Sequence, residues 1–138
     1  MSLPEQQPKF FLDRSLGRVA VSALLRADGW DLMTLAEHYG VPEDEQVADT
    51  QWIQDAAERG WPILMKDKRI RYRPAEIDAV VRHKARCFVI TRGDLTSAET
   101  ADRFLASKDA IFEAATVIGP YIYAVHADRL DRLYPARS

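Results

Sequence analysis

The sequence predicts an α/β protein, a three-layer α/β/α sandwich with a mainly parallel central sheet of about five strands. Short apolar runs alternate with segments whose apolar residues recur at helical spacing, which is typical of strands joined by helices on both faces of a sheet. One of the runs, residues 62–65, is apolar throughout, as expected of a strand that is buried on both faces. The chain of 138 residues is long enough for one domain with a sizeable core.

We expect a disordered tail over residues 1–8, a single domain over 9–134 and a short tail over 135–138. The first strand is predicted at 9–12 and the first helix at 16–27, with Ser15 suited to cap it. A second strand is expected near 30–35, and residues 36–45 indicate a loop. The second helix is predicted at 50–59, headed by Asp49 and ended by Gly60. The apolar run at 62–65 is the third strand.

The second half of the chain continues the alternation. A basic loop over 66–73 leads to Pro74, a residue suited to the first turn of a helix that ends near His83. The fourth strand is expected at 86–90. The sequence Thr96-Ser97-Ala98-Glu99 is a capping box that opens a helix through 106. A further helix at 109–117, a fifth strand at 121–126 and a terminal turn or short helix at 128–134 complete the prediction.

Three aspartates occupy positions where ligands are bound in open α/β sheets. Asp13 and Asp67 each follow a predicted strand, and Asp49 opens a predicted helix. Carboxylates that share one small site raise one another's pKa unless they are neutralised, and a hard divalent cation with oxygen ligands neutralises them. We therefore predict that Asp13, Asp49 and Asp67 are the metal ligands and catalytic residues around Mg²⁺ or Mn²⁺. For each acid alone, a helix cap or an ordinary loop acid is the alternative.

Three segments carry a resemblance to a known family: F-F-L-D-R-S-L-G (10–17), D-T-Q-W-I-Q-D-A-A-E-R-G-W (49–61) and P-I-L-M-K-D-K (62–68). They resemble a PIN-like ribonuclease domain, and more closely the VapC-type toxins of bacterial toxin–antitoxin systems. The motifs span 9–68, and the order of elements continues the resemblance to about Tyr134. It implies a PIN-like fold, cleavage of single-stranded RNA, inhibition by a cognate antitoxin protein, and a homodimer.

The chain departs from the family pattern at two positions. Met65 stands where the family usually has threonine before the last acid. The glutamate of the larger PIN domains has no secure match, and Glu37 and Glu45 are the nearby candidates. Both departures put full catalytic activity in doubt.

Positive charge is concentrated in one segment. The whole chain has a net charge of -2, but residues 66–92 contain nine Lys or Arg against Asp67, Glu76 and Asp78. Such a basic stripe suits a polyanion, although a solvated surface is an equally common reason for one. Tyr72 is placed to stack on a base. The candidates for contact with RNA are Arg14, Arg18, Lys66, Lys68, Arg71, Tyr72 and Arg73.

Several functional classes lack their signatures. The sequence has no glycine-rich motif for a nucleotide cofactor. Cys87 is alone, so no internal disulfide is expected, and no apolar run approaches the roughly 20 residues of a membrane span. The first residues lack a secretory signal, so we expect a cytoplasmic protein. The three histidines lie far apart in the sequence and are expected to be structural.

Two other functions remain open at this stage. A phosphoacceptor receiver domain has a similar sheet, but it needs paired acids after the first strand and a lysine after the fifth. Asp13 has no acidic neighbour, and residues 121–126 contain no lysine. A catalytically inactive PIN-like fold, kept as a binding module, is favoured by Met65 and by the missing glutamate. Metal-dependent cleavage of RNA would distinguish the active form from the inactive one.

Overall fold

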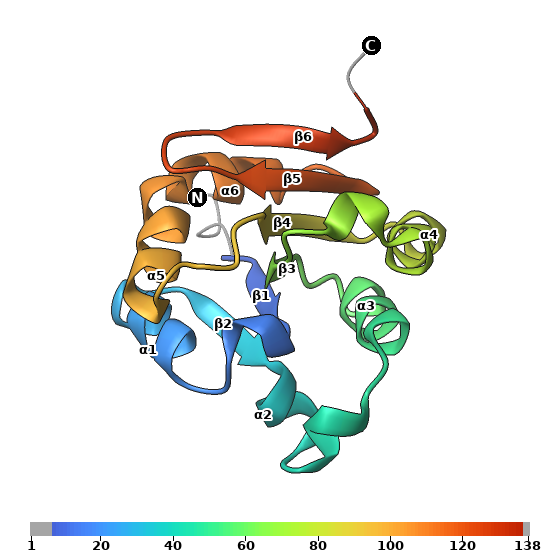
Figure 1. The fold of residues 1–138 in the computed structure, drawn as a ribbon, viewed down its shortest axis with the longest axis horizontal. Helices are drawn as coiled ribbons and strands as arrows, with labels where there is room; N and C mark the ends of the chain where they lie inside the picture. Colours follow the sequence, from blue (N-terminus) through green and yellow to red (C-terminus); the bar gives the residue numbers. More distant parts are fainter. Residues whose placement is uncertain (1–6, 137–138) are drawn as a thin grey trace, which may run out of the picture.

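The computed structural model, which describes residues 7–136, confirms the predicted α/β class and has a mainly parallel sheet (Figure 1). The sheet has six strands in the order β2-β1-β3-β4-β5-β6, one more than expected. All neighbouring strands are parallel except β5 and β6. The strands are β1 (Lys9–Leu12), β2 (Asp31–Thr34), β3 (Ile63–Lys66), β4 (Arg86–Ile90), β5 (Tyr121–Val125) and β6 (Leu130–Tyr134).

Helices cover both faces of the sheet. One face carries α1 (Ala20–Ala27), α5 (Ser97–Ala106) and α6 (Lys108–Ala114), and the other carries α3 (Asp49–Glu58) and α4 (Pro74–His83) (Figure 1). The short α2 (Leu35–Tyr39) follows β2. Three single 3₁₀ turns lie in the connections: η1 (Arg14–Leu16), η2 (Glu43–Gln46) and η3 (Ile70–Tyr72). Among residues 7–136, no helix is both long and apolar enough to cross a membrane.

The core explains why β3 is apolar at successive positions. Leu64 packs into the cluster that contains Phe10 and the residues of α1 and α5. Ile63 and Met65 point to the opposite face and pack in the cluster that contains Trp52 of α3. Since successive side chains of a strand point to opposite faces, a strand covered on both sides needs apolar residues throughout, as the sequence predicted.

The order of the strands reverses beside β1. The chain goes from β1 through α1 to β2 on one side, and then through α2 and α3 to β3 on the other side of β1. The connection from β1 to β2 therefore crosses one face of the sheet, and the connection from β2 to β3 crosses the opposite face. In open α/β sheets this arrangement leaves a crevice outside the carboxyl ends of the two strands, where ligands bind. Here the crevice lies at the ends of β1 and β3.

Several predicted boundaries coincide with the structure. The helix α4 and the strand β4 have the expected bounds. Thr96 caps α5 by accepting a hydrogen bond from the Glu99 N–H at 3.1 Å, and the Glu99 carboxylate accepts one from the Thr96 N–H at 2.9 Å. Cys87 is a free, buried cysteine, and burial raises the pKa of its thiol to about 12.

Two predicted segments were wrong. The terminal turn or short helix expected at 128–134 is the strand β6, which pairs antiparallel with β5 through a bulge. It lies at the edge of the sheet and is only half-buried, so it lacks the apolar run that marks the inner strands. The expected loop at 36–45 contains α2, which a Thr34–Glu37 capping box starts, and η2. The predicted tails at 1–8 and 135–138 lie largely outside the described residues.

Candidate metal and phosphodiester cleft

The first two acids of the site follow neighbouring parallel strands. Asp13 comes directly after β1, and its N–H donates to the carbonyl of Leu64 in β3 at 3.3 Å. Asp67 comes directly after β3, and its N–H donates to the carbonyl of Ile90 in β4 at 2.9 Å. Backbone bonds thus extend the sheet to both acids and fix them at its carboxyl edge, on either side of the crevice.

Ser15 connects the ends of the two strands. The Asp13 carboxylate caps η1 by accepting hydrogen bonds from the Ser15 N–H, at 3.1 Å, and from the Ser15 hydroxyl. The Ser15 hydroxyl oxygen in turn accepts the N–H of Lys66, at 2.8 Å. The predicted cap was wrong: the helix expected at 16–27 starts at Ala20 with Val19 as its N-cap, whereas Ser15 lies in η1. Asp13 caps η1, and Ser15 joins Asp13 to β3.

Asp13 is the most perturbed acid of the site. Its side chain is buried, and burial is the main cause that raises its pKa from 3.8 to about 7. The hydrogen bond from Ser15 opposes this rise, while the negative charges of Asp49 and Asp67 add to it. Both of these carboxylates therefore act on Asp13 through space, and a positive charge placed among the three would favour its ionised form.

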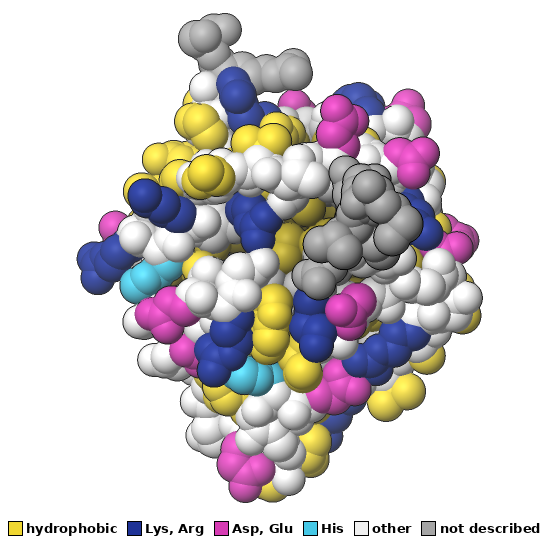
Figure 2. All heavy atoms as spheres, turned by 180° about the vertical axis from the view of Figure 1, so that it is seen from behind, with side chains coloured by type: hydrophobic (Ala, Val, Ile, Leu, Met, Phe, Trp, Pro, Cys, Tyr) yellow, Lys and Arg dark blue, Asp and Glu magenta, His cyan; other side chains and the backbone are white. Residues whose placement is uncertain are grey.

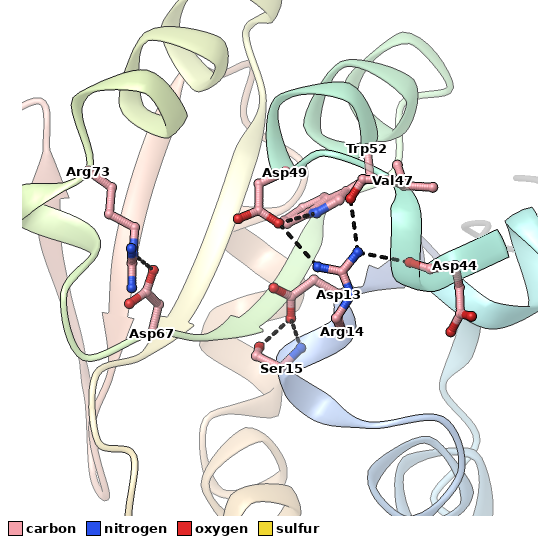
Figure 3. A network of polar contacts seen from close by, with 9 residues as sticks. All are labelled: Asp13, Arg14, Ser15, Asp44, Val47, Asp49, Trp52, Asp67 and Arg73. Atoms are coloured by element: carbon pink, nitrogen blue, oxygen red, sulfur yellow. Dashed lines mark hydrogen bonds and ion pairs between the residues drawn. The ribbon is translucent and has the colours of Figure 1, made fainter. Parts of the chain in front are cut away.

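Asp49 opens α3 without capping it. The N-cap is Ala48, which has no side chain that could cap, and Asp49 is the first helical residue. The Asp49 carboxylate instead accepts a hydrogen bond from the Trp52 indole N–H at 2.9 Å (Figure 3). Because Trp52 is buried in the core, this bond holds the carboxylate in place at the crevice.

Arg14 lies between the acids and the loop before α3. Its guanidinium donates to the carbonyls of Asp44, at 2.8 Å, and Val47, at 2.9 Å. Its other terminal nitrogen lies 3.7 Å from the Asp49 carboxylate (Figure 3). Two backbone anchors fix the guanidinium, so it is a positioned cation at the mouth of the site rather than a free surface side chain.

Asp67 makes its hydrogen bonds within its own loop. One carboxylate oxygen accepts the Arg69 N–H at 2.9 Å, and the other lies 2.5 Å from Nε of Arg73 (Figure 3). The Asp67 side chain is 13% exposed and the Arg73 side chain 42% exposed. Arg73 therefore supplies a positive charge to this acid from the more exposed side.

All three predicted acids line one cleft of about 300 Å³. The cleft also contains an acid that sequence reasoning missed, Glu76, in the first turn of α4. Partial burial raises the pKa of Glu76, and the nearby Asp49 carboxylate raises it further. The sequence contained a signal for Glu76, because Pro74 marks the start of the helix that follows Asp67, and Glu76 lies in the first turn of that helix. The cations of the cleft are Arg14, Lys66 and Arg73, and its remaining walls are Ser15, Trp52 and Met65.

The two glutamates considered from the sequence lie elsewhere. Glu37 belongs to the α2 capping box and pairs with Arg26 at 2.6 Å. Glu45 pairs with Arg18 at 3.1 Å. Neither residue lines the cleft, so the fourth acid at this edge of the sheet is Glu76.

The predicted RNA contacts divide into two groups. Arg14, Lys66 and Arg73 line the cleft. Arg18 pairs with the buried Asp44 at 2.9 Å, which gives it a structural partner. Tyr72 is 80% exposed on η3. Arg71 lines a different groove, and Lys68 packs near Gly93; neither lines the cleft. On the face opposite to that of Figure 1, basic side chains are interspersed with acids rather than gathered in one patch (Figure 2).

The donor set of the cleft suits a hard divalent cation. Its acids provide only oxygen ligands, which Mg²⁺ prefers. Burial is the main cause of the raised pKa of Asp13, and such an ion would offset the negative charges of Asp49 and Asp67 that add to it. Within residues 7–136, however, no three His, Cys, Asp or Glu side chains converge as a ready metal site. Asp67 faces Arg73, and Arg14 lies beside Asp49. The assignment of Asp13, Asp49 and Asp67 as ligands therefore stays a prediction.

Comparison with known proteins gives the class. A family model described as "PIN like domain" matches residues 8–92, a range that runs from β1 past β4 and contains all four acids. The chain belongs to the PIN-like domain family, as its sequence motifs predicted. Within that family it is of the VapC type: it is 42% identical over 123 residues to "Putative ribonuclease VapC45" of Mycobacterium tuberculosis, with 89% of each chain covered. No solved structure matches the chain.

Proposed function

We propose that this protein is a divalent-cation-dependent endoribonuclease that hydrolyses phosphodiester bonds of single-stranded RNA. One observation carries the proposal: four carboxylates, two that directly follow β1 and β3 and two in the first turns of α3 and α4, line a single cleft at the point where the strand order reverses. The family match and the name of the mycobacterial relative support a ribonuclease.

In this proposal Asp13, Asp49 and Asp67 hold Mg²⁺ or Mn²⁺, and Glu76 provides a fourth carboxylate beside Asp49. When bound, the cation would polarise a phosphodiester oxygen and lower the pKa of the attacking water. Glu76 would take up the proton that the attacking water loses as its oxygen bonds to phosphorus, for which a raised pKa is suited. The bond from phosphorus to the leaving ribose oxygen then breaks, and that oxygen takes a proton from solvent water. Ser15 and Trp52 keep Asp13 and Asp49 oriented through the hydrogen bonds described above.

The cations of the cleft would hold the substrate. Arg14 is fixed by two backbone carbonyls and needs little further ordering to accept a phosphate. Arg73 has one face towards Asp67 and is otherwise accessible, so it can bind a phosphate oxygen with its remaining N–H groups. Together with Lys66, they would keep the strand over the four acids.

We further propose that the protein is the toxin of a toxin–antitoxin pair and acts in the cytoplasm. Its membership of the VapC type supports a cognate antitoxin as a partner. A homodimer is proposed on the same family basis. Copurification of the chain with the product of a neighbouring gene, followed by loss of RNA cleavage in the complex, would test the pairing.

The activity is tested with purified protein on single-stranded RNA in Mg²⁺ or Mn²⁺. Asp67→Asn is close to isosteric and can still accept hydrogen bonds, but it lacks the charge that offsets a cation. It should lower the cleavage rate more than about 100-fold, because losing even the groups that support a metal ligand costs about 10–100-fold. Asp78→Asn, at an exposed acid on α4 that pairs with Arg82, is the matched control. Equal cleavage by wild type and Asp67→Asn would contradict the proposal.

Met65 favours a second candidate, the catalytically inactive binding module. Met65 lines the cleft at the position where the family usually has threonine, and its side chain offers no hard oxygen ligand. Wild type that binds RNA but cuts none in either metal, free of any antitoxin, would select this candidate. Restored cleavage in Met65→Thr would then identify the cause.

A further inference from the structure

A second pocket of about 170 Å³ opens next to the acid cleft, between η1, the end of β3 and the start of α5. We call it the α5 pocket. Its lining combines three hydroxyl groups, one cation and apolar walls: Ser15, Ser97, Thr100, Lys66, Leu16 and Leu95. Ser15 and Lys66 also line the acid cleft. A polymer lying over the acids can therefore reach the α5 pocket by passing Lys66.

The hydroxyl of Thr100, a residue that lines this pocket, has no hydrogen-bond partner within the described chain. Its side chain is 1% exposed, and its hydroxyl is the one buried side-chain polar group within residues 7–136 that lacks a hydrogen-bond partner. The buried hydroxyls of Ser22 and Thr34 both have backbone partners. Leaving a buried polar group unpaired costs about 1–3 kcal/mol. Thr100 lines the α5 pocket, so a turn of its side chain about the Cα–Cβ bond would bring this hydroxyl to a partner that comes from outside the chain.

The charges around the pocket favour a neutral group inside it and an anion at its mouth. The Glu99 carboxylate lies in the first turn of α5, where it disfavours a phosphate. Arg92 is occupied by Asp94, at 2.7 Å. Lys66, in contrast, forms no ion pair with any carboxylate of the described chain. The available cation thus sits between the acid cleft and a pocket lined by hydroxyls.

We propose that the α5 pocket binds the ribose of the nucleotide next to the scissile phosphate, with its 2′-hydroxyl hydrogen-bonded to the Thr100 hydroxyl. Lys66 then contacts the phosphate at the mouth of the pocket. The proposal rests on the proposed ribonuclease function and adds a reason for choosing RNA over DNA. The 2′-hydroxyl both donates and accepts, and so does the threonine hydroxyl, which makes each a suitable partner for the other.

The test is a scan of 2′-hydroxyl groups against Thr100→Val, which keeps the side-chain shape and removes the hydroxyl. The variant should fold, because it removes an unpaired buried group. Wild type should cut an all-ribose oligonucleotide about fivefold better than one that has a single 2′-deoxy sugar beside the cut, the effect of one hydrogen bond. Thr100→Val should cut the all-ribose substrate about fivefold less well, with no further loss on that deoxy substrate. Thr116→Val, at an exposed threonine after α6, should behave as wild type.

A binding scan separates this inference from the proposed function. The same labelled oligonucleotides are titrated by fluorescence anisotropy into Asp67→Asn, with and without Thr100→Val, so that no cleavage is needed. The inference is supported if one 2′-deoxy sugar lowers the affinity of Asp67→Asn for the oligonucleotide and if this difference disappears when Thr100→Val is added. This result would support the inference even if wild type cuts no RNA. The inference is overturned if the protein with Thr100→Val still binds the all-ribose oligonucleotide better than the deoxy one, or if no single 2′-deoxy sugar changes the affinity. The Thr100 hydroxyl would then bind only water.

Discussion

Replacing Asp13 by Asn should stabilise the cation-free protein at alkaline pH. Burial raises the pKa of Asp13 to about 7, so the folded protein retains a proton that the unfolded chain releases near pH 3.8. Stability rises with pH only where the unfolded state binds more protons. Here the folded state binds more of them between these two values, so stability should fall as the pH rises from about 4 to about 7, and level off above.

The size of the effect follows from the same shift. A pKa that moves from 3.8 to about 7 corresponds to about 4 kcal/mol, at about 1.4 kcal/mol for each pKa unit. Asn keeps an oxygen that accepts the Ser15 N–H and hydroxyl hydrogen bonds, and it carries no charge at any pH. At pH 8 the variant should therefore unfold at a temperature about 10 °C higher, because 1 kcal/mol is worth about 2–4 °C in a domain near this size. At pH 4 the two proteins should melt together.

Thermal unfolding in EDTA from pH 4 to pH 9 measures this difference, with Asp102→Asn, at an exposed acid on α5, as the control. Adding Mg²⁺ at pH 8 should stabilise wild type, by about 2.7 kcal/mol at 100 times the dissociation constant, and leave Asp13→Asn nearly unchanged. If Asp13→Asn melts below wild type at every pH, the carboxylate stabilises the fold and the interpretation is wrong. If Mg²⁺ stabilises wild type and Asp13→Asn equally, Asp13 is not a ligand of the proposed cation.

Two further predictions concern the cleft. Glu76→Gln should weaken Mg²⁺ binding, measured by calorimetry, because Glu76 shares the cleft with the other acids. It should also shift the acidic limb of the pH profile of cleavage, because Glu76 has a raised pKa. An unchanged affinity and an unchanged profile would show that Glu76 has no part in either. Replacing both Lys66 and Arg73 by glutamine should weaken RNA binding. It should also reduce the slope of log affinity against log salt concentration by the amount expected for about two lost phosphate contacts. The pair Lys68 and Arg71, which does not line the cleft, is the matched control, and an equal effect of both pairs would indicate non-specific attraction.

The sequence predicted those parts of the fold that local patterns determine. The uniformly apolar run of β3 marked a strand covered on both faces, and a capping box marked the start of α5. The positions of Asp13 and Asp67 followed from these elements, because an acid after a buried parallel strand must lie at the carboxyl edge of the sheet. The edge strand β6 has no such pattern, since its half-exposed face places little demand on residue type.

The composition of the site could be predicted only in part, because its contacts join distant segments. Glu76 is 27 residues beyond Asp49, and it reaches the cleft only because α4 packs beside α3. The contact of Arg14 with the Val47 carbonyl spans 33 residues. Spacing along the sequence carries no information about such approaches. They depend on how helices on the same face of the sheet are placed, which is set by packing rather than by local propensity.

The charges around the cleft would link the proposed cation binding to the proposed RNA binding. Four carboxylates and three cationic side chains line it, so its formal charge is one negative when every group is ionised. A phosphate backbone is then repelled more by the acids than it is held by Arg14, Lys66 and Arg73. One divalent cation among the acids changes the formal charge to one positive, and the same side chains can hold a phosphate. Because coupling between two ligands is reciprocal, RNA in the cleft would also increase the affinity for the cation.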